Sequence, residues 1–223
     1  MFNLMKLISV RPEASAAERA ALLAVLEAAP ERNPQIQGAR LHPTVPGVHK
    51  CADFIWRVQF ADERTYRACI RTSDWLQVDQ ALQAGIVSHI DSAAYMEEAR
   101  GLSEPGMKNG RYRALLVARR PGIGAEKFAR YEAEQREMAR YMPAIQNWSL
   151  SRVVEGSGDR QWDYVWEQEF QDHDPWMKSY MLHPYHWARI HRWFDPESPD
   201  WIHDPWHALS VCEFTDSILG SKN

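Results

Sequence analysis

The sequence of 223 residues contains only three cysteines, Cys51, Cys69 and Cys212, and no Cys-x-x-Cys pair. An odd number of cysteines at wide spacing fits neither a disulfide framework nor a zinc ribbon. Because free thiols persist best in a reducing compartment, the composition predicts a cytoplasmic protein.

Long runs of one chemical character are also missing. No stretch approaches the roughly 20 apolar residues that a membrane-spanning helix requires. Lys and Arg form no cluster, and the formal net charge is -4. The sequence therefore lacks the electrostatic footprint of a protein that binds nucleic acid or an anionic membrane. With 45% hydrophobic and 25% charged residues, it has the composition of a globular protein.

Motifs that hold common cofactors are absent as well. There is no GxSxG elbow, no P-loop and no GxGxxG, since the pair Gly122 and Gly124 lacks a third glycine. Five histidines follow residue 180, but their spacing matches no named metal site, and no residue stands out as a haem ligand. We therefore predict neither a metal nor another cofactor.

Aromatic residues, in contrast, are abundant. The chain has ten Trp, eight Tyr, seven Phe and nine His, and Trp and His are crowded after residue 160. Aromatic side chains bury large areas, so a heavy core, a dimer interface and an aromatic-lined pocket all stay open as explanations.

The two halves of the sequence resemble each other. Residues 52–60, ADFIWRVQF, align without a gap with residues 162–170, WDYVWEQEF, at an offset of 110. Arg11-Pro12 aligns with Arg120-Pro121 at an offset of 109, so one inserted residue reconciles the two matches. A register kept over most of each half indicates a tandem repeat.

Each half is predicted to run strand, helix, strand, strand, helix, strand. In the second half, the periodicity predicts a strand over 112–119, a helix over 128–142, a hairpin over 148–170, a helix over 175–193 and a last strand over 207–214.

The first half repeats this order, with a helix over 16–27 and a hairpin turn near 48–50. We therefore predict an α+β fold with two units, residues 1–105 and 110–223. A four-stranded antiparallel sheet with helices on one face leaves its other face apolar, so we expect the two sheets to pack face to face around an interior that can hold a small ligand.

One motif contains side chains that can act as acids and bases. Tyr180, His183 and His186 form a Y-x-x-H-P-x-H string, in which Pro184 breaks or restarts the helix and holds the histidines close together.

With this string in the second of two such units, the chain resembles the stress-responsive dimeric α/β barrel family, and its second half resembles a plant polyketide cyclase of that family. The resemblance implies two ferredoxin-like units fused into an α+β barrel. It also implies that Tyr180 and His186 form the acid/base pair of a cofactor-free ring closure. Such a pair predicts a pH limb near the imidazole pKa.

The first half has lost these groups, because the alignment places Ile70, Ser73 and Leu76 opposite the three motif residues. A purely architectural role would have survived in both copies, so the loss favours a functional site in the second half. Helix capping by His186 and packing by Tyr180 are the alternative explanation.

Further residues are predicted to surround the acid/base pair and bind the substrate. They are Tyr164 and Trp166 on one face of a strand, Trp201 and His203 on the segment 195–206, which we interpret as a lid or a solvated connection, and Arg113 and Arg189 as carboxylate clamps.

These observations predict a cofactor-independent isomerase, cyclase or hydrolase. We expect it to act on a small oxygenated conjugated compound, such as a ring-cleavage product of aromatic catabolism or a polyketide. A non-catalytic small-molecule binder and a haem or metal oxygenase are the alternatives. Pairing of two fused barrels into a homodimer also stays open.

Overall fold

The computed structural model describes residues 1–45, 51–171 and 180–220. The expected turn near 48–50 and the first part of the helix expected over 175–193 lie outside these residues.

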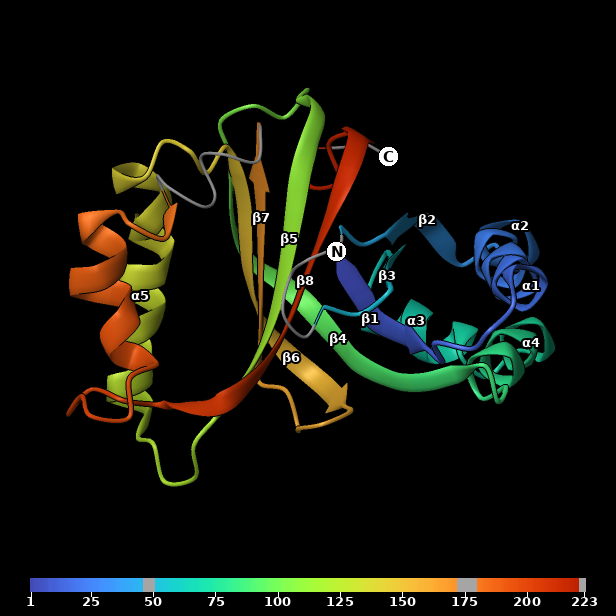
Figure 1. Cartoon of the computed structure of the whole chain (residues 1–223), viewed down its shortest axis with the longest axis horizontal. Coiled ribbons are helices and arrows are strands. Elements are labelled where there is room, and N and C mark those ends of the chain that lie inside the picture. Colours follow the sequence, from blue (N-terminus) through green and yellow to red (C-terminus); the bar gives the residue numbers. More distant parts are fainter. Residues whose placement is uncertain (46–50, 172–179, 221–223) are drawn as a thin grey trace.

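The first half of the chain is built in the order that the sequence predicts (Figure 1). Its elements are β1 (Phe2–Val10), α1 (Ala16–Glu27), α2 (Ala29–Arg32), β2 (Ile36–Pro43), β3 (Phe54–Phe60), α3 (Glu63–Cys69), α4 (Ser73–Leu82) and β4 (Val87–Leu102). The helix α1 begins at a capping box, in which the Ser15 side chain accepts from the Glu18 backbone and the Glu18 carboxylate accepts from the Ser15 backbone.

The second half repeats the order. Its elements are β5 (Lys108–Arg119), α5 (Ala125–Tyr141), β6 (Asn147–Ser157), β7 (Tyr164–Phe170), a π-helical turn (His186–Ile190), a 3-10 turn (His191–Trp193) and β8 (His203–Asp216). The strands β3 and β7 begin and end 110 residues apart, at the offset of the sequence repeat.

All eight strands form one antiparallel sheet in the order β2-β3-β1-β4-β6-β7-β5-β8. Each half contributes its four strands in the same relative order, and the pairing of β4 with β6 joins the halves. The predicted fold class, two ferredoxin-like units fused into one barrel, is confirmed, but the expectation of two separate sheets is wrong. The reason is the length of β4, whose 16 residues leave a long edge that β6 covers.

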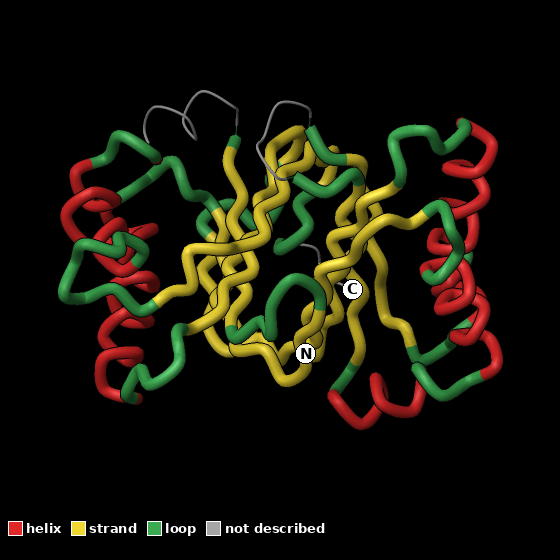
Figure 2. Tube along the Cα trace, turned by 60° about the horizontal axis from the view of Figure 1, so that its bottom comes forward, coloured by secondary structure: helices red, strands yellow, loops and turns green. Residues whose placement is uncertain are grey.

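The sheet curls until its outer strands meet. The Thr44 and Cys212 backbones form a bridge, and the Val45 amide donates to the Val211 carbonyl at 2.8 Å. Figure 2 shows the strands in the centre and the helices on the two outer sides. The molecule therefore has a barrel interior and two outer layers, one between each half-sheet and its helices.

The centre of the barrel interior is filled by a polar network rather than open space. Arg57 Nε donates to Glu167 at 2.8 Å, and both side chains are almost fully buried. The Tyr95 hydroxyl, the Tyr112 hydroxyl and the Ser149 hydroxyl donate to the same carboxylate at 3.0, 2.5 and 2.7 Å. This network ties strands of both halves together and occupies the space where the sequence suggested a ligand.

Candidate active site

The outer layer of the second half, called the C-terminal layer, lies between the outer face of β5, β6 and β7 and the helices that cover it. Its buried apolar residues include Leu115, Phe128, Met138, Trp166 and Trp193. Because strand side chains alternate, Arg113 on β5 and Gln168 on β7 project into this layer and lie opposite each other.

Arg113 is a buried cation without a carboxylate partner in the described part of the chain. Arg113 is 8% exposed, and its Nη1 atom donates to Gln168 Oε1 at 2.6 Å. Its Nε atom is buried and has no hydrogen-bond acceptor among the described residues. An isolated buried charge is costly, so the arrangement favours an anion beside Arg113.

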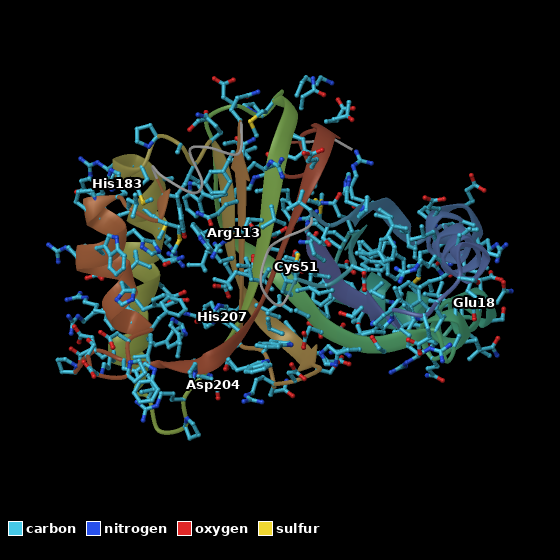
Figure 3. All side chains as sticks on the ribbon, in the orientation of Figure 1. Glu18, Cys51, Arg113, His183, Asp204 and His207 are labelled. Atoms are coloured by element: carbon cyan, nitrogen blue, oxygen red, sulfur yellow. The ribbon has the colours of Figure 1, made fainter. Side chains whose placement is uncertain are left out.

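Tyr180 and His186 lie next to this cation. Their ring centroids are 5.0 Å apart, and Arg113 Cζ lies 5.4 Å from the centroid of the Tyr180 ring. Tyr180 is buried and Phe170 meets its ring edge to face at 5.8 Å. Figure 3 labels Arg113 on β5 and His183 on the helical side of the layer.

Burial is the main cause that lowers the pKa of His186 to about 4, and the nearby positive charge of Arg113 adds to the effect. The imidazole is therefore neutral at pH 7 and can accept a proton. Its Nδ1 atom is buried and unpaired among the described residues. If His186 is the general base, activity is consequently expected to fall near pH 4 rather than in the usual imidazole range.

Two residues of α5 add unpaired polar atoms to the layer. The Tyr131 hydroxyl and Gln135 Oε1 are buried, and neither has a hydrogen-bond partner in the described structure. Burial, followed by the neighbouring Tyr180, raises the pKa of Tyr131. We refer to the six residues Arg113, Tyr131, Gln135, Gln168, Tyr180 and His186 as the polar cluster.

His183 has a local structural task. Its Nδ1 accepts a hydrogen bond from the Tyr185 amide at 3.1 Å, and its carbonyl accepts from the Trp187 amide. In the first half, the Thr72 hydroxyl accepts from the Trp75 amide at the start of α4 in a similar way. His183 is therefore a helix cap, and the capping function is present in both halves although the residue type differs.

Tyr164 and Trp166 project from the same face of β7, as expected, and both are buried. The Tyr164 hydroxyl donates to Glu132 at 2.8 Å and lies 2.9 Å from Arg152 Nε, so its polar end is already paired. Trp166 packs beside Trp148 with ring centroids 5.5 Å apart. Of the two, only Trp166 has an unpaired polar atom, its indole nitrogen.

The other three predicted binding residues are placed differently. Arg189 has a side chain 58% exposed that lies 3.9 Å from Glu134. Trp201 carries the Arg120 guanidinium over its ring at 3.5 Å. His203 is fully buried and stacks on Phe194 at 4.2 Å.

His203 pairs in the sheet with Arg119, six positions along β5 from Arg113. At about 3.3 Å per residue, these positions are roughly 20 Å apart. The tertiary structure therefore brings Tyr180, His186 and Arg113 together, and His203 lies at the other end of the layer.

The segment 195–206, interpreted from the sequence as a lid or a connection, is anchored along the second half. Asp200 lies 3.2 Å from Arg192, and the Pro199 carbonyl accepts from Lys127 at 2.6 Å. Its last four residues already belong to β8. A lid function of the segment 195–206 remains a prediction.

The sequence analysis did not predict that Tyr131, Gln135 and Gln168 belong to the polar cluster. A signal was present, because all three are polar residues on otherwise apolar faces of a helix and a strand. The three positions would have been informative once those faces were known to be buried.

Several comparisons place the chain among known proteins. Residues 112–203 match the model of the Stress responsive A/B Barrel Domain family. No curated protein sequence matches the chain. No helix in the described ranges is both long enough and apolar enough to cross a membrane.

Solved structures resemble the whole chain in fold. An anthrone oxidase-like protein has 8% identity and a TM-score of 0.72, with 99% of this chain and 94% of that chain covered. A proposed monooxygenase of Fusobacterium nucleatum has 9% identity and a TM-score of 0.62, with 100% and 96% covered. A second one, of Lactobacillus acidophilus, has 10% identity and a TM-score of 0.56, with 96% and 95% covered.

At such low identity these structures support the fold alone, which extends over both halves. The family model, in contrast, covers most of the second half, including the polar cluster. Residues 112–203 therefore match the stress responsive A/B barrel domain, and this match confirms the resemblance that the Y-x-x-H-P-x-H string indicated.

Proposed function

We propose that the polar cluster is the active site of a cofactor-independent acid/base enzyme. Its substrate is a small conjugated anion. The observation that carries the proposal is the buried Arg113, which has no carboxylate partner in the described part of the chain and lies beside the Tyr180 and His186 rings. A carboxylate or enolate oxygen of the substrate supplies the missing counter-charge.

Each residue has a task that follows from its chemistry. Neutral His186 removes a proton from a carbon or hydroxyl group through its unpaired Nδ1. Arg113 stabilises the negative charge that develops on the substrate oxygen, and the Tyr180 phenol donates to it or returns the proton. Return of the proton at another atom gives isomerisation. Attack of the enolate on a second carbonyl gives ring closure.

Binding is tested with benzoylacetate, an aromatic β-keto carboxylate, by isothermal titration calorimetry. Loss of a hydrogen-bonded charge is expected to weaken binding in Arg113→Met by about 10- to 100-fold. The control is Arg111→Met on the same strand, where the guanidinium pairs with Glu213 near the surface. Equal affinity of the wild-type and Arg113→Met proteins would contradict the proposed anion site.

Proton transfer is tested separately, by deuterium exchange at the carbon between the two carbonyl groups of benzoylacetate. The wild-type protein is expected to accelerate the exchange over buffer, and His186→Ala is expected to lose the acceleration. Binding without accelerated exchange would favour the non-catalytic binder. Oxygen uptake with substrate, or a haem band in the visible spectrum of the purified protein, would favour the oxygenase alternative.

A further inference from the structure

A second candidate site lies at one end of the barrel, outside the C-terminal layer. A cavity of about 230 Å³ there is lined by Leu7, His89, Asp91, Asp159, His207 and Ser210, together with neighbouring residues. His89 and Asp91 lie on β4 of the first half, and Asp159 lies in the connection from β6 to β7 of the second half. Figure 3 labels His207 on β8 beside this end of the barrel.

Three potential ligand atoms converge at this cavity. His89 Nε2 is 3.1 Å from Asp91 Oδ2 and 3.6 Å from Asp159 Oδ1. One ligand atom from each of the three residues lies within 4.8 Å of the others. Around a metal ion with bond lengths of about 2.0–2.2 Å, neighbouring ligand atoms are separated by roughly 3.0–3.5 Å, so the His89 distances are close to those of a coordination shell.

The three groups do not satisfy one another by hydrogen bonding. His89 Nε2 is shielded from solvent, yet it makes no hydrogen bond with acceptable geometry in the described structure. Among the described residues, no Lys or Arg side chain lies within 4 Å of the Asp91 or Asp159 carboxylate. Two carboxylates with no strong cation between them create a local excess of negative charge beside the imidazole.

The remaining carboxylate oxygens are held in place by other groups. Asp91 Oδ1 accepts from the Asp159 amide at 3.0 Å, and Asp159 Oδ2 accepts from the Trp206 indole at 2.8 Å. These contacts orient the free oxygens, as outer hydrogen bonds do around known metal sites.

Gly158 allows this approach. It has φ of +124°, and a Cβ there would lie 2.2 Å from Asp91 Oδ1. A larger residue at position 158 would therefore displace the Asp91 carboxylate.

We propose that His89, Asp91 and Asp159 bind a divalent first-row transition cation. One imidazole nitrogen and two carboxylate oxygens form a donor set typical of zinc, manganese or iron, whereas calcium and magnesium prefer oxygen donors alone. Coordination positions that the three side chains leave unfilled would be open to water or to an oxygen atom of a small molecule in the cavity. Because each half contributes ligands, the site exists only where the two halves are joined, and it is independent of the polar cluster.

The test is calorimetric titration of untagged, chelator-treated full-length protein with ZnCl₂. One zinc ion per chain is expected, and Asp159→Asn and His89→Ala are each expected to weaken binding at least about 10-fold. Substitution with Co²⁺ gives a second readout, since a visible d–d spectrum with nitrogen and oxygen ligands is expected in the wild-type protein and its loss is expected in both variants.

Two controls separate this site from other metal-binding groups. Asp163 belongs to the same connection, but its carboxylate pairs with Arg119 at 2.9 Å, so Asp163→Asn is expected to bind zinc normally. His191→Ala removes a histidine from the helical segment of the second half and is also expected to bind normally. Zinc binding that is unchanged in Asp159→Asn and His89→Ala, or that is lost in His191→Ala, would overturn the proposal.

Discussion

The outer layers of the two halves share one architecture but differ in chemistry. In the first half, Leu4 on β1 faces Val58 on β3, and both pack in an apolar core. At the equivalent place in the second half, Arg113 on β5 faces Gln168 on β7. The same sheet position therefore holds an apolar pair in one copy and a polar pair in the other.

The covering helices differ in the same way. Leu22 and Leu26 of α1 are buried in the first half, and the repeat offset of 109 places Tyr131 and Gln135 of α5 opposite them. Four apolar positions of the first layer are thus polar in the second. Burial of incompletely paired polar groups is unfavourable for stability, so their concentration in one copy supports the proposed active site.

The aligned motif positions also differ in burial. Leu76, aligned with His186, is 54% exposed, whereas its neighbour Trp75 is buried and stacks on Trp56 at 5.8 Å. At these aligned positions the first half therefore has an exposed leucine, and the second half has an imidazole beside Tyr180.

The strongest test of this comparison is His186→Ala measured beside Leu76→Ala. We expect kcat of His186→Ala for proton exchange of benzoylacetate to fall by about 10² to 10⁴, because the general base that acts in the transition state is lost. The thermal stability of this variant is expected to change little. Leu76→Ala is expected to retain full kcat. Full activity of a folded His186→Ala protein would end the acid/base hypothesis.

A second test replaces the polar pair of the C-terminal layer by the apolar residue types found at the equivalent positions of the first half. The double variant Arg113→Leu/Gln168→Val is expected to gain about 1–4 kcal/mol in the free energy of unfolding, because an apolar pair replaces a buried charge. It is also expected to lose benzoylacetate binding. Urea denaturation and calorimetry provide the two measurements. A loss of stability would show that Arg113 is needed for folding rather than for a ligand.

The third test concerns pH. Burial and Arg113 lower the pKa of His186 to about 4, so kcat/KM is expected to stay level from pH 7 to about 5 and to fall as the pH drops through 4. In the unfolded chain the same imidazole takes up its proton near pH 6.5. Its contribution to stability is therefore complete above about pH 6.5 and is lost as the pH falls toward 4.

The pKa itself can be measured by NMR titration of the His186 ring. In Arg113→Leu/Gln168→Val it is expected to rise, because the second cause of the shift is removed. A wild-type value near 6.5 would contradict a half-buried imidazole whose pKa is lowered to about 4.

The smallest expected effect concerns the helix caps. His183→Ala and Thr72→Ala are each expected to lose about 0.5–2 kcal/mol of stability, since each removes a side-chain acceptor at a helix start. His183→Ala is expected to keep kcat within a few fold. A large loss of kcat without a loss of stability would return His183 to the catalytic residues.

The sequence by itself determined the repeat, the order of the elements and the motif. The strand, helix, strand, strand, helix, strand order depends on local periodicity and turn residues, which act over a few positions. The helix expected over 16–27 corresponds to α1, and the strand expected over 207–214 lies within β8. The Y-x-x-H-P-x-H string placed Tyr180 and His186 side by side for the same reason, because the two residues are close in the chain.

The tertiary structure decided which buried face of the sheet holds each polar residue. In β5 the buried positions are nearly continuous from Tyr112 to Ala118, because one face packs in the barrel and the other against helices. With both faces buried, the apolar alternation that would distinguish them disappears. The sequence pattern therefore does not show which face of the sheet Arg113 and its neighbour Tyr112 occupy. Arg113 lies in the polar cluster, whereas Tyr112 donates to Glu167 inside the barrel.

Only the tertiary structure could also bring His89 and Asp91 to Asp159, which is 68 residues beyond Asp91 in the chain. Their approach depends on the pairing of β4 with β6, and that pairing depends on the edge that the long β4 leaves open. The spacing of residues in the sequence predicts which side chains are neighbours within one helix or strand. The contacts between elements of different halves follow from how the whole sheet closes.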